Sequence, residues 1–390
     1  MSQGAGTHTI FVRMAKSQGR PSHWLCAAQF LLAFSACICG RPAPASADET
    51  AYTITTVAGN GERGFDGDGG SATAAKLNRP CAVAVDLEGT IYIADYSNNR
   101  IRQVRVDGII STLAGTGEAG FSGDCGPATK AKLQGPYGVC VDNRGNIYIA
   151  DQRNNRIRKV GRDGTISTVA GNGQRGFTGD GGPAIDASLA GADATAVSGD
   201  GVLYIADSRN HRVRKVTADG LITTIAGTEK GYAGDGGPAV QARLNVPAAL
   251  GFDLSGNLLV GDFGNHVVRK ITADGMIRTV AGTGKRGFGG DGMLATLASL
   301  NEPGGVGITP DGNLLIADGV NCRVRRVDRS GIIQTVAGTG KRGYSGDGGP
   351  ALRADLSVLD ILAVDRTGNV YLADHTNNRI RKLTPIVTKN

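Results

Sequence analysis

The amino-acid sequence predicts an all-β protein, a six-bladed β-propeller. One phrase, "IADYSNNRIRQV" in its first copy, recurs six times at intervals of 55 or 56 residues, with its aspartate at Asp95, Asp151, Asp207, Asp262, Asp318 and Asp374. Each unit holds four short apolar runs, and 61 of the 390 residues are glycine, which favours tight turns. A four-stranded sheet repeated around an axis removes long exposed edges, which is what a propeller achieves.

Residues 1–47 are expected to be a secretory signal peptide, and residues 48–390 the propeller. Basic residues precede an apolar stretch at 24–39, and "PASA" ends at Ala47. This order of a basic, an apolar and a small-residue region is typical of a cleaved leader. We therefore expect a secreted or periplasmic protein whose mature chain has no transmembrane segment.

Two alternatives concern this leader. Translation could start at Met14, and Cys37 could carry a lipid anchor, although Phe34 stands where a lipobox usually has Leu. The leader holds four basic residues and no acid, so the net charge of +7 falls to 7 − 4 = +3 in the mature chain. Nucleic acid is therefore not an expected partner.

Four cysteines follow the leader: Cys81, Cys125, Cys140 and Cys322. They form no CxxC pair and no metal-binding spacing, so we expect neither a metal nor a cofactor. One disulfide is possible in an oxidising compartment, with Cys81 and Cys125 as the first candidates.

The second unit shows the expected elements in order. Apolar runs at 137–142, 146–151, 156–160 and 165–171 are separated by short turns, which predicts four antiparallel strands joined by hairpins. Small residues alternate along the first run of each unit, as in "YGVC", so this strand is expected to line the channel. We expect these inner strands to contribute essentially no titratable groups.

The two ends of the propeller predict how its ring closes. The last unit stops at "RIRKLTPIVTKN" without a fourth strand, whereas "TITTVAG" at 53–59 precedes the first unit. We expect this N-terminal strand to complete the last blade.

These units resemble NHL repeats. The core pattern "DxxGNxYIADxxNNRIRKV" matches closely in five units and loosely in the fourth, where Gly261 and Val267 depart from it. The "GFxGDGGPA" insertion resembles that of secreted bacterial NHL proteins and of the NHL region of teneurins. The resemblance covers residues 52–383 and implies the propeller fold. It implies no single function, since NHL propellers include adhesion and sensor modules, RNA-binding domains and an amidating lyase.

Residues that repeat in every unit are expected to be structural. One aspartate lies in each inter-blade loop, and we expect it to cap a short helical turn that begins at the following proline, in preference to binding calcium. One asparagine lies in each second turn, and we expect it to order that turn. These residues are Asp68, Asp124, Asp180, Asp235, Asp291 and Asp347, and Asn98, Asn154, Asn210, Asn265, Asn321 and Asn377.

The position after that asparagine varies and holds His211, His266 and Cys322 in consecutive units. Equivalent points on neighbouring sheets lie about 10 Å apart, which is too far for one zinc ion. Hydrogen-bonding or surface roles are therefore expected for these residues. His375 lies outside this register and is a weaker candidate still.

The inter-blade loops suggest a binding surface, because cations precede their aromatic residues. Such a surface could attract an anionic polysaccharide or an acidic protein. The plainer alternative is that exposed turns carry charge, partly balanced by Glu62, Glu118 and Glu229, while the aromatics pack beneath the loops. The candidate binding residues are Arg63, Arg175, Lys230, Lys285, Arg286, Lys341, Arg342, Phe177, Tyr232 and Tyr344.

Function is therefore expected to be that of an exported binding or interaction module. The alternative is a propeller enzyme, a lyase or hydrolase with its site at the channel mouth. No serine nucleophile elbow, HExxH motif or paired catalytic carboxylate occurs, so no catalytic residue is assigned. The oligomeric state is left open.

Overall fold

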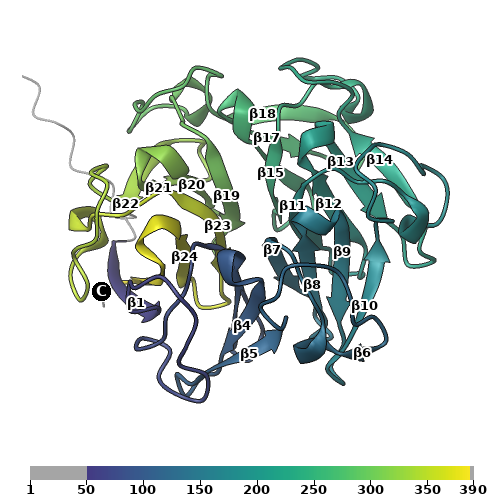
Figure 1. Ribbon diagram of the computed structural model, residues 1–390. Helices are drawn as coiled ribbons and strands as arrows, with labels where there is room; N and C mark the ends of the chain where they lie inside the picture. Colours follow the sequence, from purple (N-terminus) through teal and green to yellow (C-terminus); the bar gives the residue numbers. More distant parts are fainter. Residues whose placement is uncertain (1–50, 387–390) are drawn as a thin grey trace, which may run out of the picture. The chain divides into compact units, whose positions relative to one another are not determined.

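The computed structural model describes residues 51–386, which form six antiparallel sheets around a common axis (Figure 1). This confirms the predicted six-bladed propeller. The predicted signal peptide lies outside the described residues. Within the described part of the chain, no helix is long and apolar enough to cross a membrane.

Each blade runs from an inner to an outer strand. Blade 1 is β2 (Pro80–Val85), β3 (Ile91–Asp95), β4 (Arg100–Val104) and β5 (Ile110–Ala114). Blade 2 is β7 (Pro136–Val141), β8 (Ile147–Asp151), β9 (Arg156–Val160) and β10 (Thr165–Ala170), with the short β6 (Gly126–Pro127) at its edge. Blade 3 is β11 (Ala192–Val197), β12 (Leu203–Asp207), β13 (Arg212–Val216) and β14 (Ile222–Ala226).

The other three blades repeat this order. Blade 4 is β15 (Pro247–Phe252), β16 (Leu258–Asp262), β17 (Val267–Ile271) and β18 (Ile277–Ala281). Blade 5 is β19 (Pro303–Ile308), β20 (Leu314–Asp318), β21 (Arg323–Val327) and β22 (Ile333–Ala337). Blade 6 is β23 (Leu359–Val364), β24 (Val370–Asp374), β25 (Arg379–Pro385) and β1 (Tyr52–Ala58).

Short 3₁₀ helices occupy two recurrent places. In the second turn of each blade lie η1 (Tyr96–Asn98), η3 (Gln152–Asn154), η5 (Ser208–Asn210), η7 (Phe263–Asn265), η9 (Gly319–Asn321) and η11 (His375–Asn377). In the inter-blade loops lie η2 (Ala128–Lys130), η4 (Ala184–Asp186), η6 (Ala239–Gln241), η8 (Ala295–Leu297) and η10 (Ala351–Arg353).

The N-terminal strand closes the ring, as the sequence predicts. β1 pairs antiparallel with β25, so that Tyr52 faces Pro385 and Ile54 faces Leu383. In Figure 1 the purple β1 lies beside the yellow last blade. The side chain of Ile54 is fully buried, which stabilises the closed blade by about 2 kcal/mol. The inner strands contact one another in the cyclic order β2, β7, β11, β15, β19, β23 and back to β2.

The hydrophobic core lies in layers between neighbouring blades. Between blades 2 and 3, for example, Tyr148 and Ile157 pack in one cluster with Leu203 and Ile205. The "GPA" segment of the inter-blade loop adds Ala184 to the same cluster. Each loop therefore covers the outer end of the layer that it bridges.

One repeated glycine explains part of the high glycine content. Gly171 follows β10 with φ +92°, and an added Cβ would lie 2.3 Å from the carbonyl oxygen of Asn155. A side chain would therefore meet both a backbone clash and an unfavourable backbone conformation.

The inter-blade aspartates do not cap helices, so this part of the sequence prediction is wrong. The helix η4 begins after Pro183 without any side-chain capping bond. Asp180 instead lies 2.7 Å from the guanidinium of Arg214, a side chain of 0% exposure. Because Arg214 loses all its water, its charge needs carboxylate partners more than the helix needs a cap.

Every blade contains the same buried network. In blade 2, Arg158 contacts the buried Asp151 at 3.5 Å and the partly exposed Asp124 at 2.7 Å. Asn154 donates to Asp151 at 2.8 Å and to the carbonyl of Gly120 at 2.7 Å, which ties the second turn to the inter-blade loop. Burial raises the pKa of Asp151 to about 6. These two hydrogen bonds are those that the predicted ordering role of the asparagines requires.

The loop aromatics cover this network from outside. The ring of Phe177 lies 3.8 Å from the guanidinium of Arg212 and 4.8 Å from that of Arg214. Tyr344 stacks in the same way on Arg379 at 3.6 Å. Blade 4 has Val267 in place of the first arginine, so Tyr232 contacts Arg269 alone, at 5.2 Å.

The four cysteines in the described part of the chain are all free, so the possible bond between Cys81 and Cys125 is not formed in this structure. Cys81 is buried on the inner strand β2, whereas Cys125 is exposed in an inter-blade loop. The backbone N–H of Cys125 bonds to Ile166 of the outer strand β10. The Cys81 thiol therefore lies on the inner side of the blades, and Cys125 lies at their outer edge.

Candidate functional site at the channel mouth

Six residues at one register position surround the mouth of the channel. Each is the second residue of an inner strand, at the end where the second turns and the inter-blade loops lie. We call this set the mouth ring: Cys81, Tyr137, Asp193, Ala248, Gly304 and Asp360. No two neighbouring blades carry the same residue at this position.

The mouth ring has a polar half and a small half. Asp360, Cys81, Tyr137 and Asp193 come from the consecutive blades 6, 1, 2 and 3, and the other two positions are alanine and glycine. The expectation that inner strands carry essentially no titratable groups is therefore wrong. The alternating small residues on which that expectation depends lie further along the strand than the second position.

A second layer of residues links blade 1 to 2, blade 2 to 3, blade 3 to 4 and blade 6 to 1, whereas Gly319 of blade 5 has no side chain at this position. It consists of the first residue of each second-turn helix. Tyr96 of blade 1 packs edge-on against Tyr137 of blade 2, with ring centroids 5.8 Å apart. Gln152 of blade 2 donates to Asp193 of blade 3, and the hydroxyl of Ser208 donates to the carbonyl of Pro247. His375 occupies this position in blade 6.

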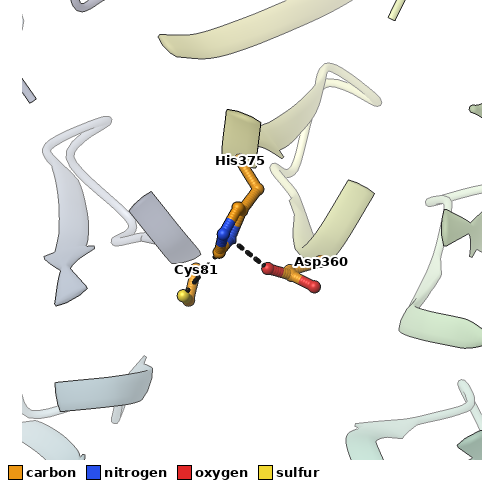
Figure 2. Close-up of side chains that lie close together, drawn as sticks. All are labelled: Cys81, Asp360 and His375. Carbon is orange, nitrogen blue, oxygen red and sulfur yellow. Dashed lines mark hydrogen bonds and ion pairs between the residues drawn. The ribbon is translucent and has the colours of Figure 1, made fainter. Parts of the chain in front are cut away.

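His375 joins two members of the mouth ring. Its Nδ1 lies 2.6 Å from Oδ2 of Asp360 and 3.5 Å from Sγ of Cys81, and Figure 2 shows the imidazole between the two. Its Nε2 accepts a hydrogen bond from Nε of Arg79 at 3.2 Å. The Nδ1 proton is then directed at the carboxylate. The sequence placed His375 low among the candidates, and the structure makes it central to this cluster.

Burial and mutual repulsion make the ionised forms of Cys81, Tyr137 and Asp193 unfavourable. Burial, followed by the charge of Asp360, raises the pKa of the Cys81 thiol well above its ordinary value. The same two causes raise the pKa of Tyr137. Burial raises the pKa of Asp193 to about 6, against hydrogen bonds from Gln152 and Ser208. The charge of Asp360 acts on all three groups, which shows that the polar half forms one electrostatic unit.

The histidines that follow the second-turn asparagines form hydrogen bonds between neighbouring blades, and they do not form one cluster. Nδ1 of His211 accepts from the backbone N–H of Val246, and Nδ1 of His266 accepts from that of Glu302, each at 3.2 Å. Asn155 makes the same bond to Gly191 with its side-chain oxygen. Histidine thus replaces asparagine as an acceptor here.

The predicted loop cations are all exposed and share one backbone geometry. Arg63, Arg175, Lys230, Arg286 and Arg342 each form the same isolated bridge to a leucine of their own loop. None of these five has an ion pair within residues 51–386. The nearby glutamates pair elsewhere, since Glu62 contacts Lys76, Glu118 contacts Lys132 and Glu229 contacts Arg243.

One of these cations lines a cavity beside the mouth ring. Arg175 surrounds a space of about 190 Å³ together with Arg153, Arg209, Gln152, Asn155 and Gly191. Because Gln152 also bonds to Asp193, this basic cavity adjoins the polar half of the ring. Lys285 is exposed, and Lys341 is exposed with Asp355 at 3.8 Å. The binding role of all these cations and of Phe177, Tyr232 and Tyr344 stays a prediction.

Comparison of the mouth positions one by one could have found the site from the sequence. The residue after the first position of each inner strand reads Cys, Tyr, Asp, Ala, Gly and Asp. A position that varies within otherwise uniform repeats is the available signal. The approach of His375 to Cys81 could not be read in this way, because it depends on the ring being closed.

Comparison with known proteins supports both the repeat type and the fold. The Teneurin NHL domain model matches residues 45–122, 117–178 and 285–343. Teneurin-m of Drosophila melanogaster is 28% identical over an alignment of 353 residues that covers 80% of this chain and 12% of that protein. Teneurin-4 of Mus musculus is 34% identical over an alignment of 251 residues that covers 55% of this chain and 9% of that protein. The chain thus spans a small part of the length of these relatives.

Solved structures show the same fold at low identity. An auxiliary nutrient binding protein from Bacteroides thetaiotaomicron VPI-5482 matches with a TM-score of 0.62 and 15% identity, over 86% of this chain and 77% of that one. A streptogramin B lyase matches with a TM-score of 0.51 and 13% identity, over 86% of this chain and 98% of that one. At such identities the likeness concerns the fold alone.

Proposed function

Because the chain is an NHL-repeat protein that resembles the NHL region of teneurins, we propose that it is a binding module that recognises an acidic protein surface with its loop-rich face. The observation that carries this proposal is the set of five exposed cations at equivalent loop positions, none of them neutralised by an ion pair within the described residues.

Three features support recognition by charge. The loop glutamates pair with other cations, so the positive charge of the five positions stays uncompensated. The backbone bridges hold these positions in the same geometry. Three arginines, Arg153, Arg175 and Arg209, line one cavity, and guanidinium suits bidentate contact with carboxylates.

The test compares charge reversal in the inter-blade loops with charge reversal outside them. The full chain is titrated with poly-L-glutamate at increasing salt, as wild type and as the Arg286→Glu, Arg342→Glu double variant. We expect the variant to bind at least about tenfold more weakly and to show a smaller salt dependence, because exposed charges act through screened attraction.

The matched control is the Arg162→Glu, Arg278→Glu double variant, which changes the net charge equally at exposed positions outside the inter-blade loops. We expect it to bind as the wild type does. Equal loss in both double variants, or binding that ignores salt, would contradict a specific basic surface. Tighter binding of polygalacturonate than of polyglutamate would redirect the proposal to an anionic polysaccharide.

We further propose that the protein is exported, on the basis of the leader-like residues 1–47. Cell fractionation of the producing organism tests this, with the periplasm or the medium as the expected location. A chain that keeps residues 24–39 and stays in the cytoplasm would contradict it.

A second candidate function is enzymatic, a lyase or hydrolase acting at the channel mouth. The polar half of the mouth ring favours this function, because it gathers a thiol, a phenol and two carboxylates on one side of the propeller axis. The other side of the ring carries only alanine and glycine. Turnover of a panel of lactones and esters that is lost in Asp193→Ala would support it. Turnover that persists in that variant would place any activity elsewhere.

A further inference from the structure

We propose that Cys81, Asp360 and His375 form a site for one Zn²⁺-like metal ion at the boundary between blades 6 and 1. The three ligand atoms, Sγ, one carboxylate oxygen and Nδ1, lie within 4.8 Å of one another. Cys81 and Asp360 are buried, and His375 is half-buried. The sequence led us to expect no metal, because these residues share no spacing along the chain.

The composition of this boundary is special within the ring. At each boundary between blades, two residues of the mouth ring flank the first residue of a second-turn helix. The other five boundaries hold Cys81, Tyr96 and Tyr137; Tyr137, Gln152 and Asp193; Asp193, Ser208 and Ala248; Ala248, Phe263 and Gly304; and Gly304, Gly319 and Asp360. Among these six sets in the described chain, only the one at blades 6 and 1 combines a thiol, an imidazole and a carboxylate.

The distances from Nδ1 of His375 to the other two ligand atoms come close to tetrahedral coordination, one without movement and one after a small movement. Bond lengths of about 2.3 Å to sulfur and about 2.0 Å to nitrogen place these two ligands about 3.5 Å apart at a tetrahedral angle. Nδ1 of His375 and Sγ of Cys81 are already 3.5 Å apart. Oδ2 of Asp360, now 2.6 Å from Nδ1, would have to withdraw by about 0.7 Å, from a hydrogen-bonding to a ligating distance.

Binding of the metal releases one proton overall, because two protons leave and one is taken up. The Nδ1 proton that now points at Asp360 leaves, the thiol proton leaves, and both lone pairs bind the ion. Arg79, which is exposed and donates to Nε2, turns toward solvent, and Nε2 takes up a proton as it does in metal-bound imidazole. Three protein ligands leave one coordination position for water or a ligand.

Such an ion would connect parts of the chain that are far apart in sequence. Cys81 belongs to β2 of the first blade, whereas Asp360 and His375 belong to β23 and η11 of the last. The ion would therefore hold the first and the last blade together at their inner strands, in addition to the closure by β1 at the outer edge of blade 6. A ligand that binds only the folded state raises its stability, so Tm should rise by a few degrees at saturating metal.

The experiment titrates the full chain, freed of metal by a chelator, with Co²⁺ alone. We expect one equivalent to give visible absorption bands of tetrahedral cobalt and a near-ultraviolet band from thiolate to cobalt, both displaced by Zn²⁺. Tm should rise with the same stoichiometry. Absence of the thiolate band at one equivalent overturns the proposal.

Each variant introduces the residue that another blade carries at the equivalent position. Cys81→Ala introduces the residue of blade 4, and His375→Gln that of blade 2, so both are compatible with the repeat. Each should abolish the thiolate band and the metal-dependent rise in Tm while leaving the circular dichroism spectrum unchanged. The matched controls His211→Asn and Cys322→Asn should keep both signals. A band that survives in Cys81→Ala or His375→Gln, or that is lost in a control, overturns the assignment.

Discussion

Two sets of equivalent residues in this propeller behave in opposite ways. The buried arginine network is chemically the same in all six blades, from Arg102 to Arg381, each with 0% exposure and two carboxylate partners. The mouth ring differs between every pair of neighbouring blades. Repetition therefore marks what every blade needs in order to fold. Positions at which the blades differ, such as the mouth ring, mark where the closed ring can bind or transform another molecule.

Removal of a network arginine should have the largest effect. We expect Arg158→Ala to lower the free energy of unfolding at pH 7 by about 3–5 kcal/mol, because Asp151 would stay buried without its charged partner. Urea unfolding measures this, with the exposed Arg162→Ala as the control. A loss below about 1 kcal/mol would mean that the network is dispensable.

Mild acidification should stabilise the folded state, because the buried carboxyls of the network bind a proton more readily than the same groups in the unfolded chain. Burial raises the folded pKa of Asp95, Asp151 and Asp262 to about 6, above the ordinary 3.8. Their contribution to stability is present below about pH 4 and is lost as the pH rises through 6. We expect the free energy of unfolding to rise between pH 7 and pH 5, by up to about 1.4 kcal/mol per group and pH unit.

Two histidines oppose this effect. Burial lowers the pKa of His211 and His266, so their protonation below about pH 6.5 destabilises the fold. The pH series is therefore best measured in the His211→Asn, His266→Asn variant, in which the rise should be steeper. A fall in stability between pH 7 and pH 5 in that variant would contradict the raised carboxyl pKa values.

The aromatic cover of the network should contribute less. A double-mutant cycle of Phe177→Leu and Arg212→Val, the latter being the residue that blade 4 carries, isolates the contact between ring and guanidinium. We expect a coupling of about 0.5–1 kcal/mol. No coupling would leave the ring of Phe177 free for the binding role that the sequence predicts.

A substitution in the mouth ring should change the free energy of unfolding least. Asp193→Ala introduces the residue of blade 4, and burial already makes the ionised carboxylate unfavourable, as the raised pKa shows. We expect the free energy of unfolding at pH 7 to change by less than about 1 kcal/mol. A loss as large as that of Arg158→Ala would remove the distinction between the two sets.

Much of the fold follows from the sequence because it depends on local patterns repeated six times. The four strands of a blade and the closing strand at 53–59 are examples. The role of Asp180 was misjudged, because Arg214, its true partner, lies 34 residues away. The cluster around His375 escaped prediction for a related reason: Cys81 reaches it only across the closed ring. Local motifs carry no information on such contacts.

The closing pair of strands also has a mechanical consequence. β1 begins at Tyr52, β25 ends at Pro385, and these two residues face each other. A force that separates the two ends of the described chain would therefore open the hydrogen bonds one pair at a time from this end. It would not shear them all at once. The propeller should yield at low force at blade 6, and the other five blades should follow.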